Sequence, residues 1–140
     1  MNVVIHHNPD CGTSRNVLAI LQAAGFSPTI IDYLNEGWTR PQLLGLFAAA
    51  GLTPRTALRA QRSPAEELGL LDQGVPDAVL IARMLEHPVL VNRPIVCTSM
   101  GVRLCRPAEL VFDLLNRLPP GPFAKEDGTL LINAEGTRVA

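Results

Sequence analysis

Apolar residues near the N-terminus predict a strand, a helix and a second strand in succession. Residues 3–5 form a short apolar run, and after a polar loop the apolar positions recur at helical spacing before Gly25: Val17, Ile20, Leu21 and Ala24. A second apolar run, residues 29–31, ends at Asp32. Because parallel strands need a helical crossover, the pattern predicts a β-loop-α-β unit with two parallel strands.

The middle of the chain combines helical spacing with signals for helix starts. Thr39 and Gln42 match a capping box, and an apolar stripe then runs to Gly51: Leu43, Leu46, Phe47 and Ala50. The start signal recurs as Ser63, Pro64 and Glu66. A further helix is predicted before Pro88, with one apolar face: Leu80, Ile81, Met84 and Leu85. We therefore expect a helical insertion over about residues 40–87.

The last third returns to strand patterns. Residues 89–91 and 95–98 are predicted strands around Asn92-Arg93-Pro94, and residues 102–105 form the return arm of a hairpin. Pro107 opens a predicted helix with one apolar face: Leu110, Val111, Leu114 and Leu115. Prolines 119, 120 and 122 end it. Residues 123–140 are predicted to be irregular or a weak hairpin, and residues 1–140 a single α/β domain.

Composition narrows the function classes. The 140 residues are 47% hydrophobic and 18% charged, with a formal charge of −1, so no global field attracts nucleic acid or an anionic membrane. We see neither a leader-like N-terminus nor an apolar run of membrane-spanning length. Three irregularly spaced cysteines favour a reducing compartment. We expect a cytoplasmic protein without nucleic-acid or membrane partners.

The segment from His7 to Arg15, His-Asn-Pro-Asp-Cys-Gly-Thr-Ser-Arg, presents Cys11 at the start of the predicted first helix. Unpaired N–H groups and the helix dipole favour a thiolate there, and His7 and Arg15 add positive charge nearby. The alternative is a small buried cysteine. Because glycine and polar residues follow Cys11, an exposed loop and helix start are favoured, and Cys11 is predicted to be a nucleophile.

Cys11 and Ser14 form C-x-x-S, a redox-thiol pattern without its second cysteine. A sulfur intermediate then needs an external thiol to resolve it. A phosphatase-type loop would need arginine six positions after the cysteine, where this chain has Val17. The cysteines lack the paired close spacings of a zinc site. We expect neither a metal nor a bound cofactor.

The sequence from His7 to Arg15 resembles the signature of the glutaredoxin-coupled arsenate reductases, the thioredoxin-like ArsC family. The resemblance continues through residues 92–96 and 103–107 to Lys125-Glu126-Asp127-Gly128, and so covers nearly the whole chain. It implies a thioredoxin-like mixed sheet flanked by helices, with a helical insertion between its two halves. Family members reduce arsenate to arsenite, with glutathione as co-substrate and glutaredoxin as protein partner.

The resemblance also implies the site. Cys11 would be the nucleophile that attacks arsenic, and Arg59, Arg93 and Arg106 would bind the oxyanion. Pro94 would be a cis-proline facing Cys11. The thiolate and an arsenate charge of roughly −1.5 to −2, by analogy with phosphate, are together balanced by three arginines. We hypothesise two auxiliary roles: His7 favours the thiolate and Ser14 hydrogen-bonds it. The alternatives are a structural role for His7 and a helix-capping role for Ser14.

Three residues leave questions open. Asp10 places a carboxylate beside the nucleophile, where many relatives carry a small or basic residue; if it points inward, it would raise the thiol pKa and repel arsenate. Cys97 and Cys105, on predicted strands, are interpreted as structural rather than resolving cysteines.

Other functions fit the same fold. A glutathione-dependent thiol reductase without arsenate activity is the main alternative, and a redox-sensing regulator would pair Cys11 with a second cysteine, where Ser14 stands. A monothiol glutaredoxin-like protein would leave the three arginines unexplained. We expect a monomer.

Overall fold

The computed structural model describes all 140 residues and contains a mixed α/β arrangement, which confirms the predicted fold class. Two compact units are present: Met1–Ile31 together with Arg93–Ala140, and Asp32–Asn92. The second unit contains the predicted insertion of residues 40–87, whereas the single-domain assignment stays a prediction. No helix has both the length and the apolar character needed to cross a membrane.

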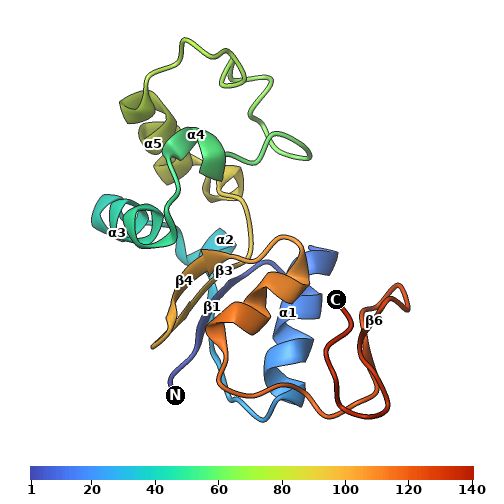
Figure 1. Cartoon of the computed structure of the whole chain (residues 1–140). Coiled ribbons are helices and arrows are strands. Elements are labelled where there is room, and N and C mark those ends of the chain that lie inside the picture. The colour runs from blue at the N-terminus through green and yellow to red at the C-terminus, as the bar shows by residue number, and fades with distance from the viewer. The chain divides into compact units, whose positions relative to one another are not determined.

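A four-stranded sheet forms the centre of the first unit (Figure 1). Its strand order is β2 (Thr29–Asp32), β1 (Val4–His7), β3 (Ile95–Thr98) and β4 (Gly101–Leu104). β3 is antiparallel to both neighbours, with Val96 opposite Ile5 on one side and Arg103 on the other. Helix α1 (Gly12–Ala23) connects β1 to β2, as the apolar spacing predicts. The sheet therefore brings the end of β1 next to the start of β3.

Two helical segments cover this sheet and enclose the core. Figure 1 shows α1 in blue beside η2 (Ala108–Leu114) in orange, and their buried side chains join those of β1 and β3 in one cluster. α1 buries the predicted stripe. η2 is a 3₁₀ helix rather than an α-helix, and it buries four residues: Ala108, Val111, Phe112 and Leu114. The predicted helix type was therefore wrong, but most of the predicted apolar face is buried: Val111, Leu114 and Leu115.

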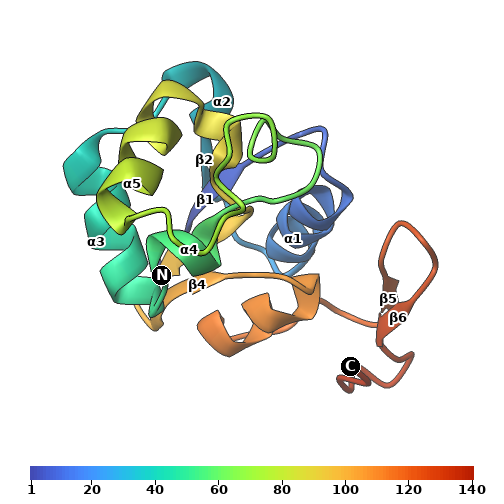
Figure 2. The same cartoon turned by 90° about the horizontal axis from the view of Figure 1, so that it is seen from above.

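The chain ends in a hairpin of β5 (Phe123–Ala124) and β6 (Leu130–Ile132), which Figure 2 shows apart from the larger sheet. Leu131 and Ile132 are fully buried in the core cluster of the first unit, so the hairpin is anchored by apolar packing. Gly121 precedes it, and a Cβ there would overlap the carbonyl oxygen of Asn133. The weak hairpin alternative for residues 123–140 is therefore the one observed.

The second unit is helical. It comprises α2 (Tyr33–Glu36), α3 (Arg40–Ala50), α4 (Pro54–Ala57), α5 (Asp77–Glu86) and η1 (Pro88–Leu90). The Thr39 capping box is present at the start of α3, and Gly51 ends that helix with a φ of 68°. α5 buries most of its predicted face: Leu80, Ile81 and Met84. The sequence signals at both helices are thus confirmed.

Two local predictions were wrong. The start signal at Ser63 leads only into turns, because Gly69 adopts a left-handed φ of 71° and ends any helix after about one turn. Residues 88–90 form η1 instead of a strand, since Pro88 occupies the first helical position. Val91 then makes a single β-bridge with Leu58.

Candidate active site

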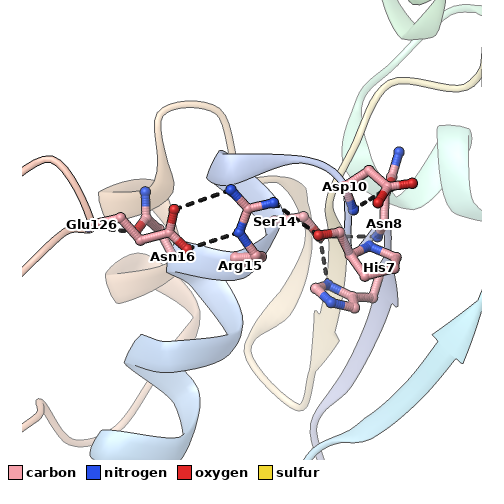
Figure 3. Close-up of polar contacts among 8 residues, drawn as sticks. His7, Asn8, Asp10, Ser14, Arg15, Asn16 and Glu126 are labelled. Atoms are coloured by element: carbon pink, nitrogen blue, oxygen red, sulfur yellow. Dashed lines mark hydrogen bonds and ion pairs between the residues drawn. The ribbon is translucent and has the colours of Figure 1, made fainter.

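The loop that joins β1 to α1, residues 8–11, is a tight turn that we call the nucleophile loop. The Cys11 N–H donates to the Asn8 carbonyl oxygen at 3.1 Å. The Asp10 N–H donates to Asn8 Oδ1 at 2.9 Å, as Figure 3 shows. Pro9 sits at the second position of this turn, where its fixed φ is favoured. The turn delivers Cys11 to the N-terminus of α1.

Cys11 is the N-cap residue of α1, with extended backbone angles of −101° and 121°. Its carbonyl oxygen accepts the first helical hydrogen bond, from Arg15 N–H at 3.0 Å. Only 5% of the residue is exposed. The sulfur is therefore held at the end of the helix where backbone N–H groups lack helical partners.

The surroundings of Cys11 favour its thiolate form. Burial alone would raise the thiol pKa, but the Ser14 backbone N–H and the guanidinium groups of Arg93 and Arg106 lower it, and the net pKa lies below its ordinary value. Arg106 Nη1 donates to Cys11 Sγ at 3.6 Å and to the Arg93 carbonyl oxygen at 3.2 Å. Thus two predicted arginines act on the predicted nucleophile.

The two arginines lie in turns next to neighbouring strands of the sheet. Arg93 lies just before β3 and Arg106 just after β4, and Cys105 N–H donates to the Pro94 carbonyl oxygen at 2.9 Å. The Arg93-Pro94 and Arg106-Pro107 peptide bonds are both cis. Antiparallel pairing of β3 with β4 therefore brings residues 93 and 106 to the same end of this strand pair.

The alkylation rate of Cys11 should report the lowered pKa directly. Only the thiolate reacts, so the midpoint of the pH profile follows the thiol pKa, and we expect it to lie below that of a free cysteine. The rate should rise as pH increases through the midpoint and then level off. Iodoacetamide kinetics with mass spectrometry of the Cys11 peptide measure it, and a midpoint at or above that of the free thiol would contradict the assignment.

Ser14 and His7 contact each other within a buried polar group. Ser14 Oγ lies 2.6 Å from His7 Nδ1 and accepts a hydrogen bond from the Asn8 N–H at 3.1 Å (Figure 3). Ser14 is fully buried. It is thus the backbone N–H of Ser14 that lowers the Cys11 pKa, while its hydroxyl bonds the start of the nucleophile loop.

Arg59 lies in the other unit, and its own contacts fix it there. Its N–H donates to the Leu90 carbonyl oxygen at 2.7 Å, and its Nε donates to the Gln61 carbonyl oxygen at 2.9 Å. The Ser63 hydroxyl donates to the Arg59 carbonyl oxygen at 2.5 Å. Arg59 is 9% exposed, which is low for an arginine. Its role toward the oxyanion stays a prediction.

Sequence reasoning missed the partner of Arg15. Arg15 forms a two-pronged ion pair with Glu126, with Nε–Oε1 at 2.8 Å and Nη2–Oε2 at 3.1 Å. No local spacing signals a pair separated by 111 positions; only the resemblance drew notice to the Lys125-Glu126 segment. Asp10, which precedes the nucleophile, is exposed.

The remaining cysteines have environments unlike that of Cys11. Cys105 is fully buried, and burial raises its pKa to about 12. Cys97, on β3, is half-buried, and burial raises its pKa as well. All three cysteines are free thiols. No group of three or more histidine, cysteine or acidic side chains is arranged to hold a metal ion.

Removing both of these cysteines should leave turnover largely unchanged. Cys97→Ser combined with Cys105→Ala keeps Cys11 and its arginines, and neither thiol is ionised near neutral pH. We expect a kcat within about twofold of the parent in the presence of glutathione, although the cavity at position 105 should lower the melting temperature. A loss of turnover in a variant that is still folded would show that one of them resolves an intermediate.

Known proteins are similar to this chain over most of its length. The ArsC family model matches residues 6–113. The chain is 65% identical to the arsenate reductase ArsI2 of Synechocystis sp. and 47% identical to the arsenate reductase of Escherichia coli K12, and each alignment covers at least 98% of both chains. The solved structure of an arsenate reductase from Vibrio cholerae is 40% identical and superposes with a TM-score of 0.77 over 82% of this chain and 98% of the other. The chain therefore belongs to the ArsC family.

Proposed function

We propose that this protein reduces arsenate to arsenite, with Cys11 as the nucleophile and with glutathione and glutaredoxin supplying the electrons. One observation carries the proposal: the Cys11 sulfur, at a helix N-terminus and 3.6 Å from Arg106 Nη1, has a lowered pKa. Relatives named arsenate reductase, at 47–65% identity over nearly the whole chain, support arsenate as the substrate.

The proposed oxyanion site uses the two arginines whose charges stabilise the thiolate. Arg93 and Arg106 both act on Cys11 through their charges. A thiolate and an arsenate dianion repel each other, so attack needs fixed positive charge at the point where they meet. Guanidinium groups bind oxyanions through paired N–H donors and do not reorganise during the reaction. Arg59 is the third proposed ligand, and the resemblance to the family is its support.

The reaction begins with the Cys11 thiolate attacking arsenic. An As–S bond forms, and one arsenate oxygen, after taking up a proton, leaves as water. Glutathione then displaces a second oxygen as water, so that arsenic(V) carries both sulfurs. These steps leave the oxidation state of arsenic unchanged.

Arsenic is reduced in the next step, which begins with attack on the glutathione sulfur. A glutaredoxin thiolate attacks it, a mixed disulfide forms, and the electron pair of the broken As–S bond reduces arsenic(V) to arsenic(III). Water then releases arsenite and restores Cys11. The two thiols that form the mixed disulfide supply the two electrons, which is why a chain with C-x-x-S needs external thiols.

A coupled assay tests the proposal. NADPH consumption is followed with glutathione, glutaredoxin and glutathione reductase, with and without arsenate. We expect consumption to depend on arsenate and arsenite to accumulate in equal amount, as measured by chromatography with elemental detection. Equal rates in the presence and absence of arsenate would reject arsenate reduction.

The same assay separates the thiol-reductase alternative. A glutathionylated peptide replaces arsenate as substrate, and glutaredoxin is left out because it reduces such mixed disulfides itself; the rate without this protein is subtracted. Turnover of the peptide together with no arsenate-dependent rate would identify a glutathione-dependent thiol reductase. Arsenate turnover without peptide turnover would support the proposed reaction.

A further inference from the structure

The tip of the C-terminal hairpin binds the first turn of α1 through Glu126. Both carboxylate oxygens accept hydrogen bonds from Arg15, at 2.8 and 3.1 Å, and the Glu126 N–H donates to Asn16 Oδ1 at 3.0 Å (Figure 3). These contacts join neighbours of the nucleophile to a segment more than 100 positions away.

The same guanidinium also holds the nucleophile loop. The remaining nitrogen, Arg15 Nη1, donates to the Pro9 carbonyl oxygen at 2.8 Å. Pro9 lies two residues before Cys11, within the turn that ends at the reactive sulfur. Arg15 therefore uses all three of its nitrogens, two on the hairpin tip and one on the loop.

The hairpin offers a fixed support for this contact. Leu131 and Ile132 are fully buried, and Lys125 Nζ lies 2.6 Å from Glu109 Oε2 on η2, in an ion pair that is mostly shielded from solvent. The Lys125 N–H donates to the Thr129 carbonyl oxygen at 2.9 Å and closes the tip. Glu126 thus projects from a tip that is anchored on both sides.

We propose that Arg15 and Glu126 are positioning residues that clamp the nucleophile loop to the C-terminal hairpin and thereby hold Cys11 against the Ser14 N–H and Arg106. The proposal rests on the proposed function for its effect on turnover. An exposed ion pair adds little to stability, and Arg15 and Glu126 are about half exposed. The ion pair between Arg15 and Glu126 instead acts by fixing the position of Cys11, because small displacements of a nucleophile reduce reaction rates strongly.

Removing Glu126 distinguishes positioning from simple electrostatics, because the two effects have opposite signs. If only charge mattered, losing the carboxylate would leave the Arg15 cation near Cys11 unneutralised, so the thiol pKa would fall. If the clamp positions the loop, Cys11 loses its hold on the Ser14 N–H and the Arg106 guanidinium, so the thiol pKa rises. The pH midpoint of alkylation reads the sign.

The experiment compares Glu126→Ala and Arg15→Lys with Glu135→Ala, a matched control that removes another exposed carboxylate from the C-terminal segment. Lysine keeps the charge of Arg15 but cannot bridge hairpin and loop. We expect both clamp variants to raise the alkylation midpoint and to lower kcat about three- to tenfold, with KM for arsenate little changed. Glu126→Asp, which retains the carboxylate, should fall between Glu126→Ala and the parent. Glu135→Ala should match the parent.

An alkylation midpoint in Glu126→Ala that is unchanged or lowered would overturn the clamp. Alkylation needs no arsenate, so its result does not depend on the proposed reaction. If the parent protein does not turn over arsenate but Glu126→Ala raises the alkylation midpoint, the clamp is supported and only the proposed arsenate reduction is rejected.

Discussion

Replacing Cys11 with serine is expected to abolish arsenate-dependent NADPH consumption, a loss of more than about a thousandfold, as found when nucleophiles are removed from other enzymes. A serine hydroxyl is not ionised near neutral pH, so neither the helix N-terminus nor the arginines can make it a comparable nucleophile. Serine is also a favoured N-cap residue, so α1 should remain intact. Circular dichroism and thermal unfolding check the fold, and the coupled assay measures the rate.

Cys97→Ser is the matched control, since it makes the same chemical change at a half-buried thiol on β3. It should retain nearly the full rate. If Cys11→Ser kept substantial arsenate-dependent activity, another group would have to be the nucleophile and the site would have to be reassigned.

Replacing Arg106 with alanine should produce the second largest effect, about a hundredfold loss in kcat/KM for arsenate. Arg106 is the side chain within hydrogen-bonding reach of the Cys11 sulfur, and it also braces the Arg93 carbonyl. Removing it takes away a charge that stabilises the thiolate and, on the proposed mechanism, a ligand of arsenate. The thiol pKa should rise, so alkylation below the new midpoint should slow. Steady-state kinetics and the alkylation profile measure the two consequences.

Arg103→Ala is the matched control, because Arg103 lies on β4, just before Arg106, and pairs with Asp113 at the surface. It should leave both measurements near those of the parent. Arg106→Lys should recover part of the pKa shift through its charge but little of kcat/KM, because an ammonium lacks the planar fork of donors. Equal kinetics for Arg106→Ala and Arg103→Ala would exclude Arg106 from the site.

Sequence patterns predicted those elements whose signals are local and consistent. The Thr39 capping box lies at the start of α3, and the stripe from Val17 to Leu21 is the buried face of α1. Predictions failed where a neighbouring residue dominated. The start signal at Ser63 is cut short by Gly69, and Pro88 turns an apolar run into a 3₁₀ helix. Periodicity alone does not weigh such single residues.

The candidate site divides in the same way. A thiol at a helix start is a local pattern, and this pattern predicted Cys11 as the nucleophile. Arg106 reaches it across 95 positions and Glu126 reaches Arg15 across 111, and such pairs depend on strand pairing and hairpin docking. The resemblance to the family implied a role for Arg106 but none for Glu126. Only the folded contacts assign one.

Position 14 bears on how one-thiol and two-thiol reductases are related. A second cysteine of a C-x-x-C pair would stand there, yet the Ser14 hydroxyl is fully enclosed and bonded by His7 and the Asn8 N–H. A thiol is larger and a weaker hydrogen-bonding group. A descendant that acquired a resolving cysteine by one codon change would disturb the loop that presents Cys11. On the proposed mechanism, the packing beneath the nucleophile thus favours an external reductant, and a resolving cysteine at position 14 would require compensating changes at neighbouring positions.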